Sequence, residues 1–208
     1  MRLRSPAVFA LFAALAGSGS ALAKETEYQV AKTCSLARYS LPYEAQAFLA
    51  PATDSEAAAS GLVTGKYSGV KPDGEGGVCS GRVYKVSRSG LKLWRIASKD
   101  KLPDALGSWW SFDKSDQTFP SRGKWRNANA VCKGWNETAD YIFRCSVKKG
   151  SFILVGGTQS ANCSKAGAGS SDIYAQNATT QVSLNARAAI DVTKCSRPSK
   201  TRWTDKGK

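Results

Sequence analysis

An arginine, a serine behind two tryptophans and a glutamine occur in this order along the sequence, each in or beside a predicted strand. Arg95 lies in Leu91–Ala97, where Leu91, Leu93 and Arg95 would share one face of a strand. A guanidinium on an otherwise apolar face needs a partner, and its planar fork suits bidentate contact with a phosphate or a carboxylate. Arg95 is therefore a candidate anion-binding residue. The competing interpretation is a structural salt bridge or an arginine at a sheet edge.

The second feature is the run Gly107-Ser108-Trp109-Trp110-Ser111. Two flat indole rings suit stacking against a nicotinamide or a nucleobase, and Ser111 would stand beside that aromatic wall. Ordinary core packing is the alternative for both tryptophans.

The third feature is Gln181, which presents a polar amide near the start of a late predicted strand, 179–184. An ordinary edge strand would show the same sequence pattern. A glycine pair, Gly156-Gly157, follows an apolar strand and predicts a turn whose amides could bind an anion. Gln159, just beyond it, is an alternative to Gln181 for the amide role.

The chain has no histidine, which restricts the chemistry that it can perform. Histidine-based triads, histidine general bases and ordinary histidine metal sites are excluded. Zinc bound by cysteines is disfavoured because no C-x-x-C spacing occurs, so we predict no metal site. Hydrolysis of a cell-wall polymer would need two positioned carboxylates. Glu137 and Asp140 are the acidic pair near the aromatic region, and their spacing favours a solvated turn.

Residues 1–23 have the pattern of a signal peptide. Arg2 and Arg4 precede an apolar run over 7–16, and Ala21-Leu22-Ala23 resembles a cleavage site. The run is shorter than the roughly 20 residues that span a bilayer. We therefore predict export, to a periplasm or to the outside of the cell, as a mature chain of about 185 residues.

All six cysteines follow the predicted signal peptide, and an even number in an exported chain predicts three disulfides. Six cysteines allow 15 pairings. Proximity along the chain suggests the pairs Cys34–Cys79, Cys132–Cys145 and Cys163–Cys195.

The formal net charge is +14, or +12 without Arg2 and Arg4. An excess of this size favours anionic partners such as an anionic surface, a phosphorylated small molecule or nucleic acid. No run of five or more like charges occurs, so a dedicated nucleic-acid arm is not indicated.

The order of elements predicts one α+β domain with a mostly antiparallel sheet pinned by disulfides. A polar and glycine-rich segment, 24–82, precedes a core over 83–196, and 197–208 is predicted to be a loose basic tail. The segment 24–82 would hold a helix near 43–50 and a short strand at 62–67. In the core we expect strands at 83–86, 91–97, 141–147, 152–155, 180–184 and 188–192, with a helix over 122–135.

The three chemical features and this order resemble the ADP-ribosyltransferase fold family over 83–192. Members of that family place an arginine on an early strand, a serine motif on a second strand, then a helix, then a late strand opening with E-x-E or Q-x-E. The resemblance implies that NAD is the substrate and that Arg95 binds its phosphate. Ser111 would support the nicotinamide ribose, Trp109 or Trp110 would wall the pocket, and Gln181 would occupy the catalytic position.

The sequence departs from the family at that catalytic position, because it carries Gln181 where the family has a glutamate. An amide can hold the ribose but supplies no charge to a cationic transition state. Either another carboxylate substitutes, with Asp172 nearest in the sequence, or the alignment of motifs is different, or the domain binds without catalysing.

These features lead to two hypotheses about function. The first is an exported NAD-binding ADP-ribosyltransferase-like toxin or effector that transfers ADP-ribose to a target. The alternative is a non-catalytic secreted or periplasmic basic domain that binds an anionic surface or a partner protein.

Overall fold

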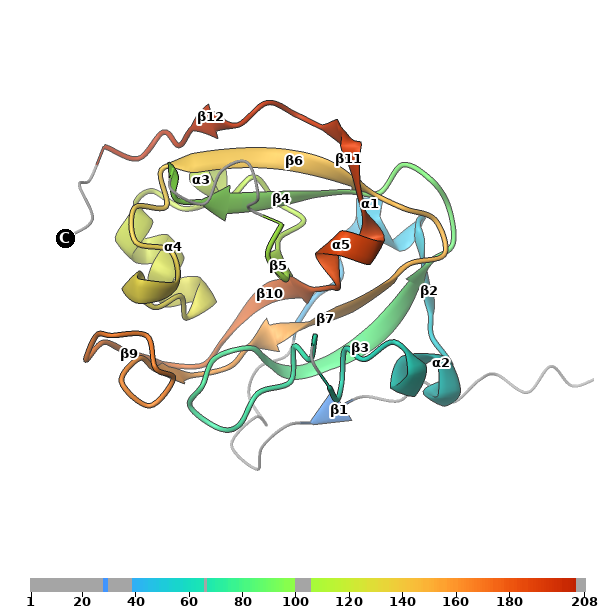
Figure 1. The fold of residues 1–208 in the computed structure, drawn as a ribbon, viewed down its shortest axis with the longest axis horizontal. Helices are drawn as coiled ribbons and strands as arrows, with labels where there is room; N and C mark the ends of the chain where they lie inside the picture. The colour runs from blue at the N-terminus through green and yellow to red at the C-terminus, as the bar shows by residue number, and fades with distance from the viewer. Residues whose placement is uncertain (1–27, 30–38, 66, 100–105, 205–208) are drawn as a thin grey trace, which may run out of the picture.

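The computed structural model describes residues 28–29, 39–65, 67–99 and 106–204 (Figure 1). Every strand pair in this part of the chain is antiparallel, and the helices are short, which confirms the predicted α+β class. The elements follow in the order β1 (Tyr28–Gln29), α1 (Tyr43–Gln46), β2 (Leu49–Pro51), α2 (Asp54–Ala59), β3 (Val78–Val86), β4 (Lys92–Ala97), β5 (Trp109–Trp110), α3 (Ser115–Thr118), α4 (Arg122–Asn129), a 3-10 helix (Lys133–Trp135), β6 (Tyr141–Val147), β7 (Phe152–Thr158), β8 (Ala161–Asn162), β9 (Ile173–Tyr174), β10 (Asn177–Ser183), α5 (Ala186–Ala189), β11 (Ile190–Cys195) and β12 (Ser199–Lys200).

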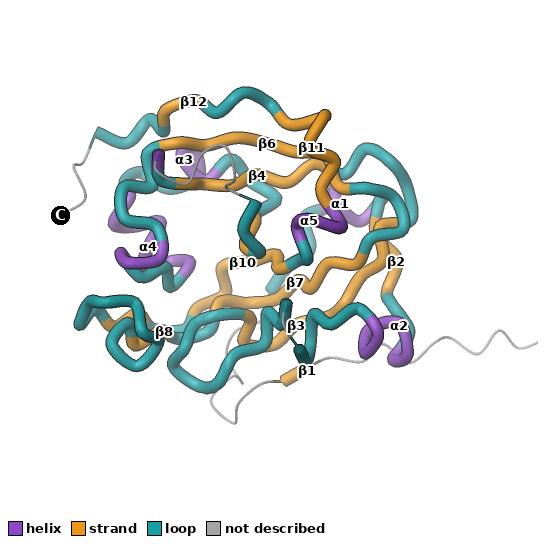
Figure 2. The backbone as a smooth tube through the Cα atoms, in the orientation of Figure 1, coloured by secondary structure: helices purple, strands orange, loops and turns teal. Residues whose placement is uncertain are grey.

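The larger sheet has the strand order β1-β3-β7-β10-β5, with β2 also paired to β3. Its centre is the long β3–β7 pair, which runs from Val78 opposite Thr158 to Lys85 opposite Phe152. The smaller sheet is built on β6, which pairs with β4 along one edge and with β11 and β12 along the other. In Figure 2 the two sheets form two layers, with α4 at one side of the space between them.

The main hydrophobic core fills the space between the two layers. Apolar side chains alternate along β4 and β6, so Leu93 and Phe143 face inward from the smaller sheet. Ile153 and Val182 meet them from the larger sheet, and both are fully buried. Burying side chains of this size contributes about 1.5–3 kcal/mol each, so this layer supplies much of the folding free energy.

The chain passes between the two sheets three times at one end of the molecule, once through α5, which joins β10 to β11. The turn at Ser89-Gly90 carries the chain from β3 in the larger sheet to β4 in the smaller one. The turn at Lys149-Gly150 carries it back from β6 to β7. These two crossings are bonded to each other, because the amides of Val86 and Gly150 donate to the carbonyls of Ser151 and Val86.

Helix α4 begins and ends for local reasons. The Ser121 hydroxyl accepts from the amide of Lys124 at 3.2 Å and caps its first turn. Ala130 adopts a left-handed conformation, φ 46°, and ends the helix. The helix predicted over 122–135 is therefore correct for its first two turns and wrong beyond Asn129, where the chain turns and then forms the short 3-10 helix.

Other local predictions are wrong in part or in full. The helix expected near 43–50 ends at Gln46 and is followed by β2, and the strand expected at 188–192 begins only at Ile190, after α5. The segment 62–65 forms bends and turns in place of the predicted strand at 62–67, whose residue 66 lies outside the described residues. The predicted glycine turn, Gly156-Gly157, is a continuation of β7. Glycine is needed there because a Cβ on Gly156 would lie 2.1 Å from the carbonyl oxygen of Ser80 on the neighbouring strand.

The two disulfides between described cysteines are Cys132–Cys163 and Cys145–Cys195. These pairs correct the predicted Cys132–Cys145 and Cys163–Cys195, which were chosen for proximity along the chain. The sheet register decides the second pair, since β11 lies beside β6 with Cys195 opposite Cys145. Cys79 is also disulfide-bonded, and its predicted partner Cys34 lies outside the described residues.

The segment after β11 packs on the smaller sheet as far as the structure describes it. β12 pairs with β6, and the amide of Thr201 donates to the carbonyl of Asp140 at 2.8 Å. Trp203 is buried, and its indole nitrogen donates to the carbonyl of Phe119 at 2.8 Å. The predicted loose tail of 197–208 thus includes a segment that is held by backbone bonds and by a buried ring.

We predict that Gly156→Ala destabilises the protein strongly, by about 3 kcal/mol or more, because the new Cβ meets backbone on the adjacent strand. Chemical denaturation of the oxidised protein measures this change. The matched control is Gly123→Ala in α4, where the Cβ would make an ordinary contact with the Ser121 hydroxyl at 3.9 Å and alanine favours the helix by about 1 kcal/mol. Equal effects of the two substitutions would contradict this account of the β3–β7 contact.

Candidate functional site

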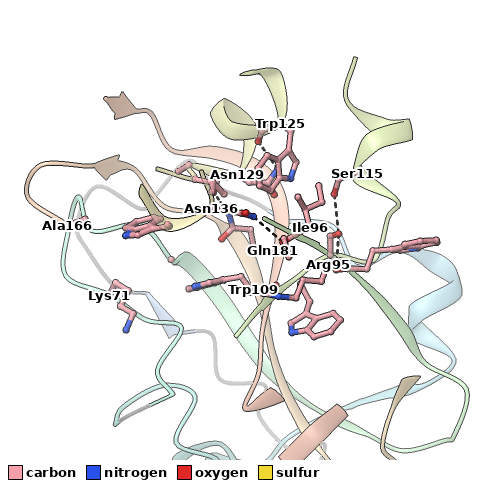
Figure 3. Close-up of a pocket in the computed structure, with 18 of the residues that line it drawn as sticks. Lys71, Arg95, Ile96, Trp109, Ser115, Trp125, Asn129, Asn136, Ala166 and Gln181 are labelled. Carbon is pink, nitrogen blue, oxygen red and sulfur yellow. Dashed lines mark hydrogen bonds between the residues drawn. The ribbon is translucent and has the colours of Figure 1, made fainter. Parts of the chain in front are cut away.

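A cavity of about 460 Å³ opens between the two sheets beside α4 (Figure 3). Side chains from β4, β5, β10 and α4 line it, together with the loop before β3 and the 3-10 helix. Five of the six tryptophans of the chain belong to its wall: Trp94, Trp109, Trp110, Trp125 and Trp135. Its volume lies within the range of small-molecule sites, which is about 300–1,000 Å³.

All five residues predicted for the site line this one cavity: Arg95, Trp109, Trp110, Ser111 and Gln181. They come from segments up to 86 positions apart in the sequence, and the sheets bring them together. The expectation that these residues share a site is consistent with this geometry, whereas their chemical roles stay predictions.

Arg95 reaches the cavity from the inward face of β4, as its alternation with Leu91 and Leu93 predicted. Its Nη1 donates to the carbonyl oxygen of Trp109 at 2.6 Å, and its guanidinium lies 5.8 Å from the centre of the Trp110 ring. Burial lowers the pKa of Arg95 to about 10, so the group stays charged at neutral pH. Gly107 makes room for it, because a Cβ there would lie 2.1 Å from Nη2.

The two tryptophans of β5 have different surroundings. Trp110 is buried, packs edge-to-face on Phe143 with ring centres 5.8 Å apart, and donates from its indole nitrogen to the carbonyl of Gly107 at 2.8 Å. Trp109 is only partly buried and packs against the hydrophobic cluster that includes Val83 and Leu154 of the larger sheet. The core-packing alternative therefore describes Trp110 better than Trp109, although both contribute to the cavity wall.

Ser111 is fixed by the contact between β4 and β5. Its backbone exchanges two hydrogen bonds with Trp94, at 2.8 and 2.9 Å. Its hydroxyl donates to the carbonyl of Asp113 at 2.8 Å and lies 3.2 Å from the hydroxyl of Ser115, which also lines the cavity. The Ser111 oxygen can accept a further hydrogen bond from a ligand hydroxyl.

Gln181 lies on β10 at the point where this strand passes under the end of α4. Its Nε2 donates to the carbonyl oxygen of Asn129 at 2.5 Å, and the Asn129 side chain donates to the carbonyl of Trp125 at 3.0 Å (Figure 3). The amide group of Gln181 is thus oriented by the helix end, and its Oε1 is the atom left to accept from a ligand. A carboxylate at this position could not make the bond to Asn129.

Sequence reasoning missed the cavity residues on α4, on the 3-10 helix and on the loop 71–77. The sequence predicted one helix over 122–135, whereas Trp125 on α4 and Trp135 on the separate 3-10 helix both line the cavity. Asn129, Asn136, Lys71 and Glu75 carried no motif.

Other residues proposed from the sequence lie outside the cavity lining. Gln159 is buried and binds the loop 71–77, with Nε2 donating to the carbonyl of Lys71 at 3.2 Å. Asp172 accepts from the Ser170 hydroxyl at 3.1 Å, so it does not supply a carboxylate next to Gln181. Glu137 and Asp140 also lie outside the lining, which leaves the two-carboxylate hydrolase without a site there.

The combination of groups favours a particular kind of ligand. Arg95 and Lys71 are cationic, the indole rings are flat and apolar, and Ser111, Asn136 and Gln181 offer hydrogen bonds. Such a wall suits a molecule with planar rings, hydroxyl groups and an anionic centre. Within the described residues, no three His, Cys, Asp or Glu side chains gather closely enough to hold a metal ion. The described helices also include none that is long and apolar enough to cross a membrane.

Comparisons with known proteins give little further information. No protein-family model and no curated protein matches the sequence. Among solved structures, that of Tne2 in complex with Tni2 aligns with a TM-score of 0.42 and 13% sequence identity, over 59% of this chain and 93% of that one. At this TM-score the likeness carries no argument about the function of the present chain.

We predict that Gln181→Glu destabilises the protein by about 1–3 kcal/mol at neutral pH, because a buried carboxylate would face the carbonyl of Asn129. These surroundings would raise the pKa of the introduced carboxyl above its unfolded value. The penalty should therefore be full at pH 7 and disappear below about pH 4, where the protonated acid can donate to Asn129. Urea denaturation at pH 7 and at pH 4 measures this, and a pH-independent penalty would argue against it.

Trp203 packs against Trp125, which lines the cavity, and the centres of the two rings lie 5.6 Å apart. We predict that Trp203→Ala lowers the free energy of unfolding by about 3–5 kcal/mol through the loss of this buried ring. Trp203→Phe keeps the ring contact, loses only the bond to the carbonyl of Phe119 and should be clearly milder. Denaturant titration of both variants tests this; a change below about 1 kcal/mol for Trp203→Ala would show that the segment adds little to the core.

Proposed function

We propose that this chain is an exported NAD-binding protein of the ADP-ribosyltransferase kind, a toxin or effector that transfers ADP-ribose to a target. The observation that carries the proposal is the convergence of Arg95, Ser111 and Gln181 in one tryptophan-walled cavity. The family resemblance drawn from the sequence had grouped the same three residues, and their common place in one cavity supports the proposal. The disulfides among the described cysteines support export, since such bonds persist in oxidising compartments.

In this proposal Arg95 binds a phosphate of NAD. Its guanidinium is held by the carbonyl of Trp109 and by the Trp110 ring, so little side-chain entropy remains to be lost on binding. A charged group in a partly enclosed site also interacts more strongly with an anion than it would in bulk water. Gly107 supports this role because its missing side chain leaves the space that the guanidinium occupies.

The nicotinamide end would lie against the indole wall. Trp109 and Trp110 offer flat surfaces for a planar ring, and Ser111 and Gln181 each retain an oxygen that can accept from a ribose hydroxyl. These contacts position the bond between the ribose and nicotinamide for transfer. Enclosure of that bond between the sheets would limit the access of water to the reacting carbon.

The experiment is an NAD titration of the oxidised mature protein, followed by tryptophan fluorescence. Five indoles line the cavity, so ligand binding should change their emission. We expect saturable binding by the wild type and a loss of about 10- to 100-fold in affinity for Arg95→Ala, which corresponds to one charged hydrogen-bonding group. Gly107→Ala should weaken binding as well, because it displaces the guanidinium while keeping the arginine.

The matched control is Arg88→Ala, which removes the same charge from the exposed turn between β3 and β4. It should leave the affinity unchanged. No binding at millimolar NAD, or equal effects of the Arg95 and Arg88 substitutions, would overturn the proposal. A basic domain that binds anionic surfaces would then remain, and its retention on a polyanion should fall steeply with salt.

A further inference from the structure

The cavity contains one carboxylate among its described lining residues, and it is Glu75. It belongs to the loop 71–77 before β3, far in sequence from the motifs that define the site. Gln181 supplies an amide and no charge, and Asp172 lies outside the lining. The negative charge that a cationic transition state requires is therefore available in this cavity from Glu75.

The backbone of the Glu75 loop is fixed at several points by the segment after β7. The amide of Gln159 donates to the carbonyl of Gly77 at 2.9 Å, and its side chain holds the carbonyl of Lys71. The amide of Gly76 donates to the carbonyl of Ser160 at 2.9 Å, and Glu75 itself forms an isolated bridge with Ala161. Side chains on this loop are thus presented from a rigid support, as a reacting group requires.

The carboxylate of Glu75 is also free of competing contacts within the described part of the chain. Three other acidic groups are engaged there: Glu56 binds Lys85 at 2.7 Å, Asp116 accepts from the amide of Arg202, and Asp191 binds Lys194. Glu75 makes no side-chain hydrogen bond or ion pair to any described residue, and it is only partly buried. Glu75 is thus a lining residue of the cavity whose charge has no structural partner among the described residues.

We propose that Glu75 is a catalytic carboxylate that stabilises the cationic ribosyl centre as nicotinamide leaves; this rests on the function proposed above. In that step the bond between ribose C1′ and the nicotinamide nitrogen breaks, and its electron pair neutralises the pyridinium ring. A lone pair of the acceptor then forms the new bond to C1′, and the acceptor's proton passes to solvent. Glu75 acts by charge alone and stays unmodified.

The physical reason for this assignment is the sign of the charges in the cavity. Arg95 and Lys71 favour the phosphates of the substrate but oppose a positive charge that develops on the ribose. Stabilisation of a developing charge by a group fixed in advance is usually the largest single contribution to catalysis. The two residues therefore have separate roles. Gln181 orients the ribose, and Glu75 provides the negative charge that the catalytic glutamate supplies in members of the ADP-ribosyltransferase family.

The test measures nicotinamide release and NAD affinity in parallel for wild type, Glu75→Gln and Glu137→Gln, with denaturation curves for all three. Glu75→Gln should lower the turnover rate by about 100-fold or more, as for the loss of one stabilising group, with affinity for NAD within about threefold of wild type. Glu137→Gln removes the same charge from an exposed residue outside the lining and should behave as wild type. Glu75→Ala should regain part of its activity in sodium formate, which returns a carboxylate to the space.

The outcomes separate the two proposals. Turnover by Glu75→Gln within threefold of wild type, or a wild type that binds NAD without releasing nicotinamide, overturns the role of Glu75 and leaves NAD binding intact. A wild type that does not bind NAD overturns the proposed function itself. Loss of both folding and activity in Glu75→Gln, with no formate rescue of a folded Glu75→Ala, would assign Glu75 to structure.

Discussion

The hydrogen-bonded connection between the two sheets at one end of the molecule is the constraint on which the rest of the structure depends. There the β3–β4 and β6–β7 crossings run side by side and share backbone hydrogen bonds around Val86 (Figure 1). Apolar side chains fill the space between the layers near this end. Toward α4, tryptophans, a helix end and the cavity lie between the layers. The end that is closed by packing is thus the end where these hydrogen-bonded crossings lie.

The polar groups of the cavity are positioned mainly by backbone carbonyls. Arg95 is held by the carbonyl of Trp109, and Gln181 by that of Asn129. Both side chains donate to these oxygens, so a donor is required at each position. For Gln181 this explains why an amide fits at this position: the end of α4 presents an acceptor to it. The amide is part of the local architecture, and the carboxylate among the described lining residues comes from another element, the loop before β3.

The sequence allowed prediction of the features that depend on local periodicity. The alternation around Arg95 predicted its inward face, and the apolar runs predicted the central strands, because both signals come from neighbouring residues. The disulfide pairs depend on which strands lie side by side, as for Cys145 and Cys195, and no local pattern contains that information. The end of α4 was missed because Ala130, a residue that favours helices, takes a left-handed conformation there. Glu75 was missed because loop side chains follow tertiary contacts.

The position of Trp203 behind Trp125 has a consequence for how the cavity forms during synthesis. Arg95, Ser111 and Gln181 are all synthesised before the segment after β11, since chains are made from the N-terminus. Trp125, which forms part of the cavity wall, gains the support of Trp203 only when β12 has paired with β6 and the Trp203 ring has packed against it. A nascent chain therefore carries every polar group of the site while one of its walls is still unsupported. The cavity therefore gains its full support only after the segment that carries Trp203 has packed.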